Sequence, residues 1–312
     1  MMVSPLIRRL IPDGTMAIPR RLQPRDAPAH AGAAITLEDI TISATGQVLI
    51  SGAAAITIDD LTVAAAGAPF YPSSEAQIAA AAGFGTWTGG AGWLFNETSG
   101  NAIPAFGGAN LVPANSPTQN GAGPRGGIDK CVSLSDNSSQ YMSGGDIFDV
   151  GATDDFIMIW VAKHSAAPSG TRVFMSKRGV STAYWSVQMA SGAGGGITGV
   201  FTDATISTIP GTVSSANHIN GTWYVGCMVL ERGVGSRVAT SIAGAGTSET
   251  VQAALLGNCG NATAISLPGR TGSVVSPVDL AAVWINTGVG IAASCNANIA
   301  TICSNVKAYL GI

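Results

Sequence analysis

From about residue 91 the sequence alternates short apolar strands with turns rich in Gly, Ser, Asn and Pro. Runs of this kind, repeated at regular spacing, are typical of an antiparallel β-sandwich or jelly roll. The clearest predicted strands are residues 130–135, 156–164, 172–178, 183–189, 196–203, 222–232 and 278–286. The sequence therefore predicts an all-β domain over residues 91–312.

Two short helices are expected beside these strands. Near the C-terminus, apolar residues recur at helical spacing, at Ile299, Ile302, Cys303, Val306 and Leu310. Gly311 is placed to end that helix. The stretch SSEAQIAAAAG predicts a helix with Ser73 or Ser74 as its N-cap and Gly83 at its end. Residues 68–90, which contain it, are expected to form a linker.

A β-rich segment of thirteen residues occurs in two similar copies, AITLEDITISATG from residue 34 and AITIDDLTVAAAG from residue 55. In each copy the period-2 apolar pattern changes parity at an acidic pair, which predicts a tight turn or bulge between very short strands. Two copies are too few for a stack that is stable alone. We expect residues 31–67 to associate with other chains, rather than to form a small sheet, through Ile35, Leu37, Ile40, Ile42, Ile56, Ile58, Leu61 and Val63.

Charge is distributed unevenly at the start of the chain. Residues 1–30 carry five Arg and two Asp, whereas residues 31–90 carry five acidic residues and no Lys or Arg. The first segment is expected to be an extended basic arm. It lacks the interleaved aromatic residues of many nucleic-acid binders. Docking on an acidic protein neighbour is therefore the favoured interpretation, with Arg8, Arg9, Arg20 and Arg21 as contact residues.

The chain as a whole carries little charge. Charged residues make up 11% of the 312 residues, about half of the ~25% typical of soluble domains. Such a surface favours a protein partly buried in an assembly over a free monomer. Five cysteines without a CxxC pair, together with Arg8 and Arg9 interrupting any apolar leader, favour assembly in a reducing cytoplasm. No run of about 18 apolar residues predicts a membrane span.

The order of several motifs resembles one family. GWLFNETSGN, GIDKCVSLSDNSSQYMS, DDFIMIWVAK, RVFMSKRG, INGTWYVGCMVLERG, VDLAAVWIN and the closing NVKAYLGI follow one another as in laminin-G-like or concanavalin-A-like jelly-roll domains. The version with a terminal helix is similar to domains of tailed-bacteriophage virion proteins. The resemblance covers about 220 residues. The strand SRVATSIAGAG lacks the family's Asp-Gly turn, so the resemblance supports no ligand role for that loop.

Few residues suggest a catalytic or metal-binding site. Glycoside hydrolases need two carboxylates flanking the bond that they cleave, but the five Glu are isolated from one another. The densest acidic group is Asp146, Asp149, Asp154 and Asp155, in a Gly-containing loop. These oxygens suit Ca²⁺, although a turn capped by Asp side chains is the favoured interpretation. We expect no catalytic residue and no cofactor, with Ca²⁺ at this loop as the exception to test.

Tryptophans could bind sugar rings where one face is exposed. Trp160, Trp223 and Trp284 fall within apolar strands and are expected in the core. Trp87 lies between Gly85 and Gly89, and is the candidate for a glycan-stacking residue.

Together, these features predict a non-enzymatic structural protein of a bacteriophage particle, assembled in the bacterial cytoplasm. The resemblance implies a tail fibre, a head fibre or a capsid decoration protein, and leaves these open. Expected partners are other virion proteins of the capsid, portal, neck or tail, further copies of the chain in a homo-oligomer, and a host-surface glycan. A carbohydrate-active enzyme and a secreted bacterial lectin are the alternatives.

Overall fold

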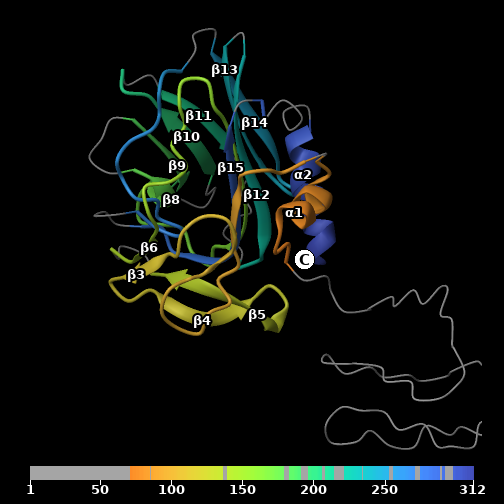
Figure 1. Ribbon diagram of the computed structural model, residues 1–312. Coiled ribbons are helices and arrows are strands. Elements are labelled where there is room, and N and C mark those ends of the chain that lie inside the picture. Colours follow the sequence, from red (N-terminus) through yellow and green to blue (C-terminus); the bar gives the residue numbers. More distant parts are fainter. Residues whose placement is uncertain are drawn as a thin grey trace, which may run out of the picture. The chain divides into compact units, whose positions relative to one another are not determined.

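The computed structural model describes residues 71–312, apart from 85, 136–138, 179–182, 191–195, 206–207, 214–220, 234, 253–255, 271–274, 289 and 292–297 (Figure 1). The chain divides into two units, Met1–Ala64 and Ala65–Ile312. The predicted arm and duplicated segment lie outside the described residues. The same holds for all the proposed assembly residues, Arg8, Arg9, Arg20, Arg21, Ile35, Leu37, Ile40, Ile42, Ile56, Ile58, Leu61 and Val63.

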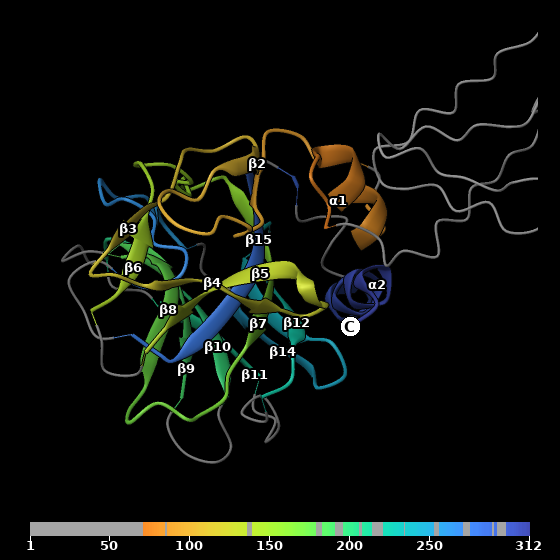
Figure 2. The same ribbon diagram turned by 90° about the horizontal axis from the view of Figure 1, so that it is seen from below.

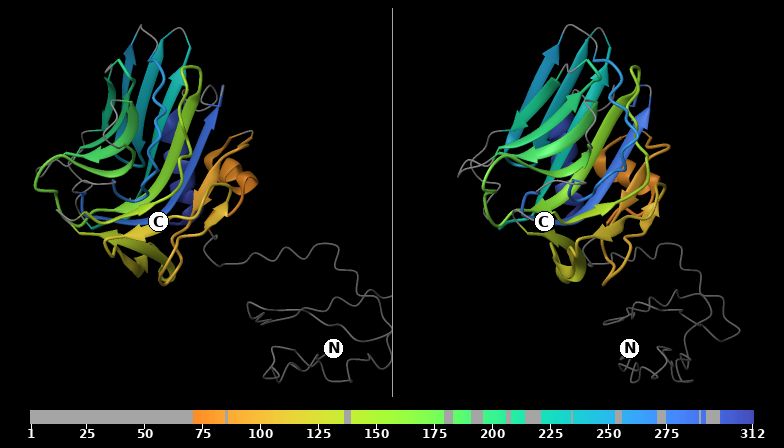
Figure 3. Two further views of the ribbon diagram at one scale, coloured as in Figure 1. Left: turned by 60° about the vertical axis from the view of Figure 1, so that its left-hand side comes forward. Right: turned by 90° about the vertical axis from the view of Figure 1, so that its left-hand side faces the viewer.

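A large antiparallel sheet forms the centre of the domain (Figure 3). In spatial order its main path is β14 (Gly246–Gln252), β13 (Ser236–Ile242), β12 (Tyr224–Arg232), β7 (Asp155–Lys163), β15 (Val278–Gly288), β1 (Ala91–Trp93) and β2 (Pro104–Phe106). The first residues of β15 also pair with β5 (Gly126–Leu134), which pairs in turn with β4 (Thr118–Gly123).

A smaller sheet packs against one face of the large sheet (Figure 1). Its strands, in spatial order, are β11 (Thr208–Val213), β10 (Ile197–Thr202), β9 (Tyr184–Met189) and β8 (Arg172–Lys177). Ser266 bridges both to Ser176 of β8 and to Ser143 of β6. The second layer therefore continues beyond β8 into the pair β6 (Tyr141–Ser143) and β3 (Val112–Ala114).

The large sheet is buried on both faces, because helices cover the face that the small sheet leaves open. Phe156 and Trp160 of β7 lie in the core between the sheets, whereas Ile157 and Val161 lie in a second core beneath the helices. A strand buried on both faces reads as an almost continuous apolar run. This explains the sequence DFIMIWVA in β7.

The helices are α1 (Glu75–Ala82) and α2 (Ile299–Leu310), and both lie on the same side of the large sheet (Figure 2). The Ser74 hydroxyl accepts a hydrogen bond from the Gln77 amide, and Gly83 ends α1 in the left-handed conformation at φ 80°. In α2 the five residues predicted from helical spacing are the buried ones. Neither helix is long and apolar enough to cross a membrane, among the residues described.

The predicted antiparallel β-sandwich with a short C-terminal helix is confirmed. The seven predicted strands correspond to β5, β7, β8, β9, β10, β12 and β15. The strands that sequence reasoning did not predict are short or polar, as β14 with GTSETVQ illustrates. Such strands are specified by pairing with a neighbour rather than by their own apolar pattern.

The linker predicted for residues 68–90 is wrong for residues 71–90. Tyr71, Ile78 and Trp87 are buried in the second core with residues of the large sheet and of α2. The Trp284 indole in β15 donates a hydrogen bond of 2.9 Å to the Pro72 carbonyl. Residues 71–90 therefore belong to the packed domain, because the large sheet needs them to cover its second face.

Candidate functional site

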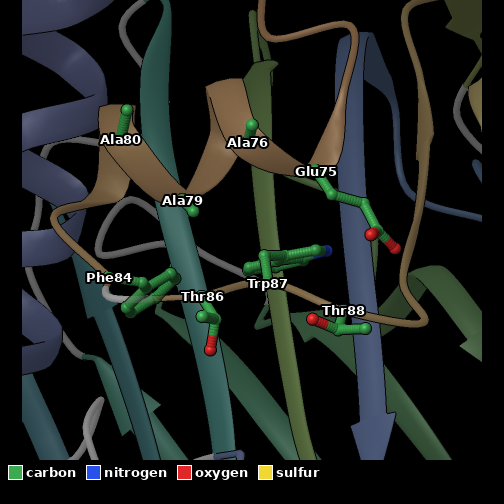
Figure 4. A pocket seen from close by; sticks show the side chains of 8 residues that line it. All are labelled: Glu75, Ala76, Ala79, Ala80, Phe84, Thr86, Trp87 and Thr88. Atoms are coloured by element: carbon green, nitrogen blue, oxygen red, sulfur yellow. The ribbon is translucent and has the colours of Figure 1, made fainter.

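A shallow pocket of about 410 Å³ opens beside α1. Its lining comes from one face of the helix and from the segment that follows it, at Glu75, Ala76, Ala79, Ala80, Phe84, Thr86, Trp87 and Thr88. Figure 4 shows the Trp87 ring below the helix, with the Phe84 ring beside it. Glu75 is the lining residue with an ionisable side chain, so the pocket offers no pair of groups for acid and base catalysis.

Trp87 is not the exposed sugar-stacking residue that its flanking glycines predicted. Its side chain is buried, with 4% of the residue exposed. The Phe84 ring stacks on it at a centroid distance of 5.6 Å and an interplanar angle of 27°. Gly90 lies against the indole, since a Cβ at Gly90 would approach Nε1 to 2.1 Å. Gly90 therefore permits close packing of the indole, whereas Gly89 is exposed and has open space around it.

Glu75 holds this segment beneath the helix. Its Oε1 accepts hydrogen bonds from the backbone amides of Gly89, at 2.7 Å, and Gly90, at 3.1 Å. A carboxylate in the first turn of a helix also interacts favourably with the helix dipole. The charged group of the pocket is thus used to fix the backbone.

The acidic loop contains a positive charge that sequence reasoning missed. The Lys177 side chain in β8 is fully buried, and its ammonium contacts the Asp146 carboxylate and lies 3.3 Å from Asp149 Oδ1. It also donates a hydrogen bond of 3.0 Å to the Thr263 carbonyl. Lys177 supplies the positive charge that a bound cation would bring to these two carboxylates. The sequence feature that could have indicated this buried cation is Lys177 itself, which lies in the mostly buried strand RVFMSK.

The other two carboxylates of the acidic loop have separate structural partners. Asp154 Oδ2 accepts a hydrogen bond of 2.9 Å from the Gly151 amide and closes a turn. Asp155 is buried and accepts a hydrogen bond of 2.7 Å from the Arg232 amide. Within the described ranges, no three His, Cys, Asp or Glu side chains are grouped as a metal site requires. The structure therefore does not bring Asp146, Asp149, Asp154 and Asp155 together, and the Ca²⁺ candidate loses its geometric basis.

Every acidic side chain in the described part of the chain has a structural partner. Seven of them form ion pairs with Lys or Arg or accept hydrogen bonds from Thr205 and Gly257. The remaining ones accept hydrogen bonds from backbone amides. The side chains are Glu75, Glu97, Asp129, Asp146, Asp149, Asp154, Asp155, Asp203, Glu231, Glu249 and Asp279.

The described cysteines are also structural. Cys131, Cys227, Cys259 and Cys303 are buried thiols. Burial raises the pKa of the Cys131 and Cys259 thiols to about 11. A nucleophilic cysteine needs the thiolate form near neutral pH, so these thiols are poorly suited to catalysis.

Two of the three tryptophans expected in the core are fully buried there, Trp160 and Trp284. Trp223 is half-buried and packs at the edge of the second core. The Lys163 ammonium lies 5.1 Å from the centroid of its ring.

Comparisons with known proteins do not assign the chain to a family. No family model and no curated protein matches the sequence. Tailspike protein 2 of Escherichia coli O157:H7 bacteriophage CAB120 aligns over 64% of this chain and 28% of its own, with 14% identity and a TM-score of 0.46. The binding domain of botulinum neurotoxin serotype D aligns over 63% of this chain and 46% of its own, with 10% identity and a TM-score of 0.44.

The binding domain of Paraclostridial Mosquitocidal Protein 1 aligns over 57% of this chain and 44% of its own, with 13% identity and a TM-score of 0.44. The chain thus spans less than half the length of the two binding domains that it matches. At this level of identity and structural agreement, the chain is similar to these proteins without being placed in the family of any of them.

Proposed function

We propose that this chain is a non-enzymatic structural protein of a bacteriophage particle. Residues 1–67 attach it to other virion proteins as an oligomer, and the β-sandwich is displayed on the particle. Display serves adhesion to a host-surface glycan or reinforcement of the shell.

The observation that carries this proposal is the engagement of all eleven described acidic side chains in structural contacts, as set out above. Glycoside hydrolysis needs two carboxylates flanking the bond that is cleaved, whereas the described pocket is lined by one carboxylate, Glu75. The described carboxylates pair with cations or accept hydrogen bonds, mostly from backbone amides. Such use of charge supports a role as a rigid display body.

The proposed attachment device differs from the sandwich in sequence and in organisation. The division of the chain between Ala64 and Ala65 leaves the basic arm, and the acidic repeat except for its last three residues, outside the unit that holds the sandwich. Arm and repeat carry opposite net charge, which suits contacts with neighbouring chains. The resemblance of the motif order to virion proteins, with the terminal helix now located at Ile299–Leu310, supports the particle assignment.

Deletion of residues 1–67 tests the attachment. We expect the shortened protein to remain folded and to be absent from purified particles, whereas the full chain is incorporated. The copy number and symmetry of the full chain in the particle would then separate fibre from decoration protein. Normal incorporation of the shortened protein would overturn the assignment of attachment to the arm and repeat.

An assay for depolymerase activity tests the non-enzymatic assignment. The full chain is incubated with host polysaccharide, and the release of reducing ends is measured. We expect no release above that of heat-denatured protein. Release that is abolished by Asp146→Asn, Asp149→Asn, Asp154→Asn or Asp155→Asn would establish the alternative, a carbohydrate-active enzyme.

A further inference from the structure

A second cation follows Lys177 directly in the chain and faces the other side of the small sheet. Lys177 is opposite Trp185 in the register of β8 and β9, and both side chains are buried on the inner side. Because side chains alternate along a strand, the neighbours Arg178 and Tyr184 face outward. The Arg178 guanidinium carbon lies 4.0 Å from the centroid of the Tyr184 ring.

Arg270 directly follows a segment that pairs with β8. The Gly269 amide donates a hydrogen bond of 2.7 Å to the Phe174 carbonyl of β8, and the Gly269 carbonyl accepts one of 3.3 Å from the Ser176 hydroxyl. Ser176 is opposite Ser186 in the register, on the face that Tyr184 occupies. Gly269, the residue before Arg270, therefore lies alongside β8, with its carbonyl at the Ser176 hydroxyl.

The charges of the two arginines are not compensated by the small sheet. Strands β8, β9, β10 and β11 contain no Asp or Glu. Neither Arg178 nor Arg270 forms a salt bridge with a described carboxylate, and the Arg270 Nε is buried without a hydrogen-bond partner. Burial, and then the charge of Arg178, lower the pKa of the Arg270 guanidinium.

In the absence of a ligand, repulsion between two nearby like charges costs free energy. An anion bound between them removes that cost. Buried polar groups are normally hydrogen-bonded, so the unpaired Nε of Arg270 also requires an explanation. Both arginines and Tyr184 are half-buried, which leaves them within reach of a ligand from solvent. The outer face of the small sheet therefore has the features of an anion site.

We propose that Arg178 and Arg270 bind the carboxylate groups of an acidic polysaccharide, with Tyr184 orienting the Arg178 guanidinium. This inference rests on the proposed function and names the glycan class that the displayed sandwich would contact.

The chemistry around the arginines favours a sugar acid. The planar guanidinium fork matches a carboxylate with two parallel hydrogen bonds. Gln188 follows Tyr184 four positions later on the same face of β9 and is half-buried, so its amide can contact a sugar hydroxyl group. Sulfate and phosphate groups are also anions that a guanidinium binds. The experiment therefore has to distinguish them from the carboxylate of a sugar acid.

Calorimetric titration of the full chain with oligogalacturonate tests the site. We expect binding that weakens as salt increases, and none to the methyl-esterified oligomer, which keeps the sugar rings and loses the negative charges. The double variant Arg178→Gln/Arg270→Gln should bind at least about tenfold more weakly, since hydrogen bonds to charged groups are worth more than one kcal/mol each. Sulfated dextran and inorganic phosphate are titrated in parallel.

The matched control is Lys130→Gln/Lys307→Gln, which removes the same charge from β5 and α2, away from the small sheet. We expect this control to bind like the wild-type chain. Equal weakening in the two double variants would overturn the site, because net charge alone would explain it. Tighter binding of phosphate or sulfated dextran than of oligogalacturonate would overturn the sugar-acid assignment.

Incorporation into particles separates this inference from the proposed function. Because attachment is assigned to residues 1–67, the Arg178→Gln/Arg270→Gln variant should be incorporated like the wild-type chain. Oligogalacturonate binding that the variant retains overturns the site, whatever the particle assay gives. Absence of the wild-type chain from particles overturns the proposed function, whatever the titration gives.

Discussion

Lys177 and Arg178 are adjacent in the sequence, yet the protein treats their charges in opposite ways. The Lys177 side chain has no exposed surface, and two carboxylates and a carbonyl surround its ammonium. Arg178 is half-buried beside an aromatic ring, and its charge contributes to the lowered pKa of Arg270. Lys177 is compensated within the fold, whereas Arg178 forms no ion pair with a described carboxylate.

The difference follows from the side of the sheet that each residue faces. An unpaired charge on the inner side would be buried in a low-dielectric core, at a large cost in free energy. On the outer side, water lowers that cost, so an uncompensated charge can be retained for binding. Stability and recognition are thus assigned to opposite faces of one strand, and substitutions on the two faces should separate them.

The largest effect is expected for Lys177→Ala. The substitution leaves a cavity and removes the shared partner of Asp146 and Asp149, and we expect the free energy of unfolding to fall by about 3 kcal/mol. This value allows for the two carboxylates being half exposed, at 48% and 52%. Urea unfolding followed by tryptophan fluorescence measures it.

Lys163→Ala is the matched control for Lys177→Ala. Its ion pair with Asp279 lies at the surface, with both side chains about a fifth to a quarter exposed. Exposed pairs of this kind contribute about 1 kcal/mol or less. Equal destabilisation by the two substitutions would show that Lys177 is not the structural cation inferred above.

The next largest loss of stability is expected when either carboxylate beside Lys177 is replaced. Asp146→Asn removes a charged contact to the buried ammonium, and should cost about 1 to 2 kcal/mol of unfolding free energy. Asp149→Asn should cost less, because its contact with Lys177 is longer, at 3.3 Å. An asparagine there can also still accept the hydrogen bond from the Asn261 amide. A larger loss for Asp149→Asn in the same unfolding experiment would reverse this ranking.

The sequence was informative where the signal lies within a single helix or strand. Helical spacing located α2 and its buried residues, and Ser74 and Gly83 located both ends of α1. The apolar runs of β7, β12 and β15 identified the central strands. In these cases the periodicity or the cap is local, so it can be read without knowing the partner.

The sequence was not informative where burial depends on distant residues. Trp87 lies between two nearby glycines in the sequence and was predicted to be exposed, but it is buried in the second core beside Phe84. The four Asp of the acidic loop look like one cluster, but Lys177 pairs with two of them, and the other two accept hydrogen bonds from the Gly151 and Arg232 amides. Arg178 and Arg270 are 92 positions apart, and the pairing of β8 with the segment at Ser266, together with the hydrogen bond from the Ser176 hydroxyl to the Gly269 carbonyl, places their two segments side by side.

A smaller effect is expected on ligand binding when the ring beneath Arg178 is removed. A cation–π contact of this kind contributes about 0.5 to 1 kcal/mol at exposed sites. Tyr184→Leu should therefore weaken oligogalacturonate binding by roughly two- to fivefold. Tyr184→Phe keeps the ring and should bind like the wild-type chain. If Tyr184→Phe weakened binding as much as Tyr184→Leu, the hydroxyl rather than the ring would be the contact.

The smallest effect is expected for the stability of the Arg178→Gln/Arg270→Gln variant. In the absence of ligand these guanidinium groups gain little from the protein, and they repel each other. Their removal should change the free energy of unfolding by less than about 0.5 kcal/mol, or raise it slightly. The same urea titration that reports on Lys177→Ala measures this. A loss as large as that of Lys177→Ala would mean that the outer cations, like the inner one, are part of the fold, and the division between the two faces of β8 would fail.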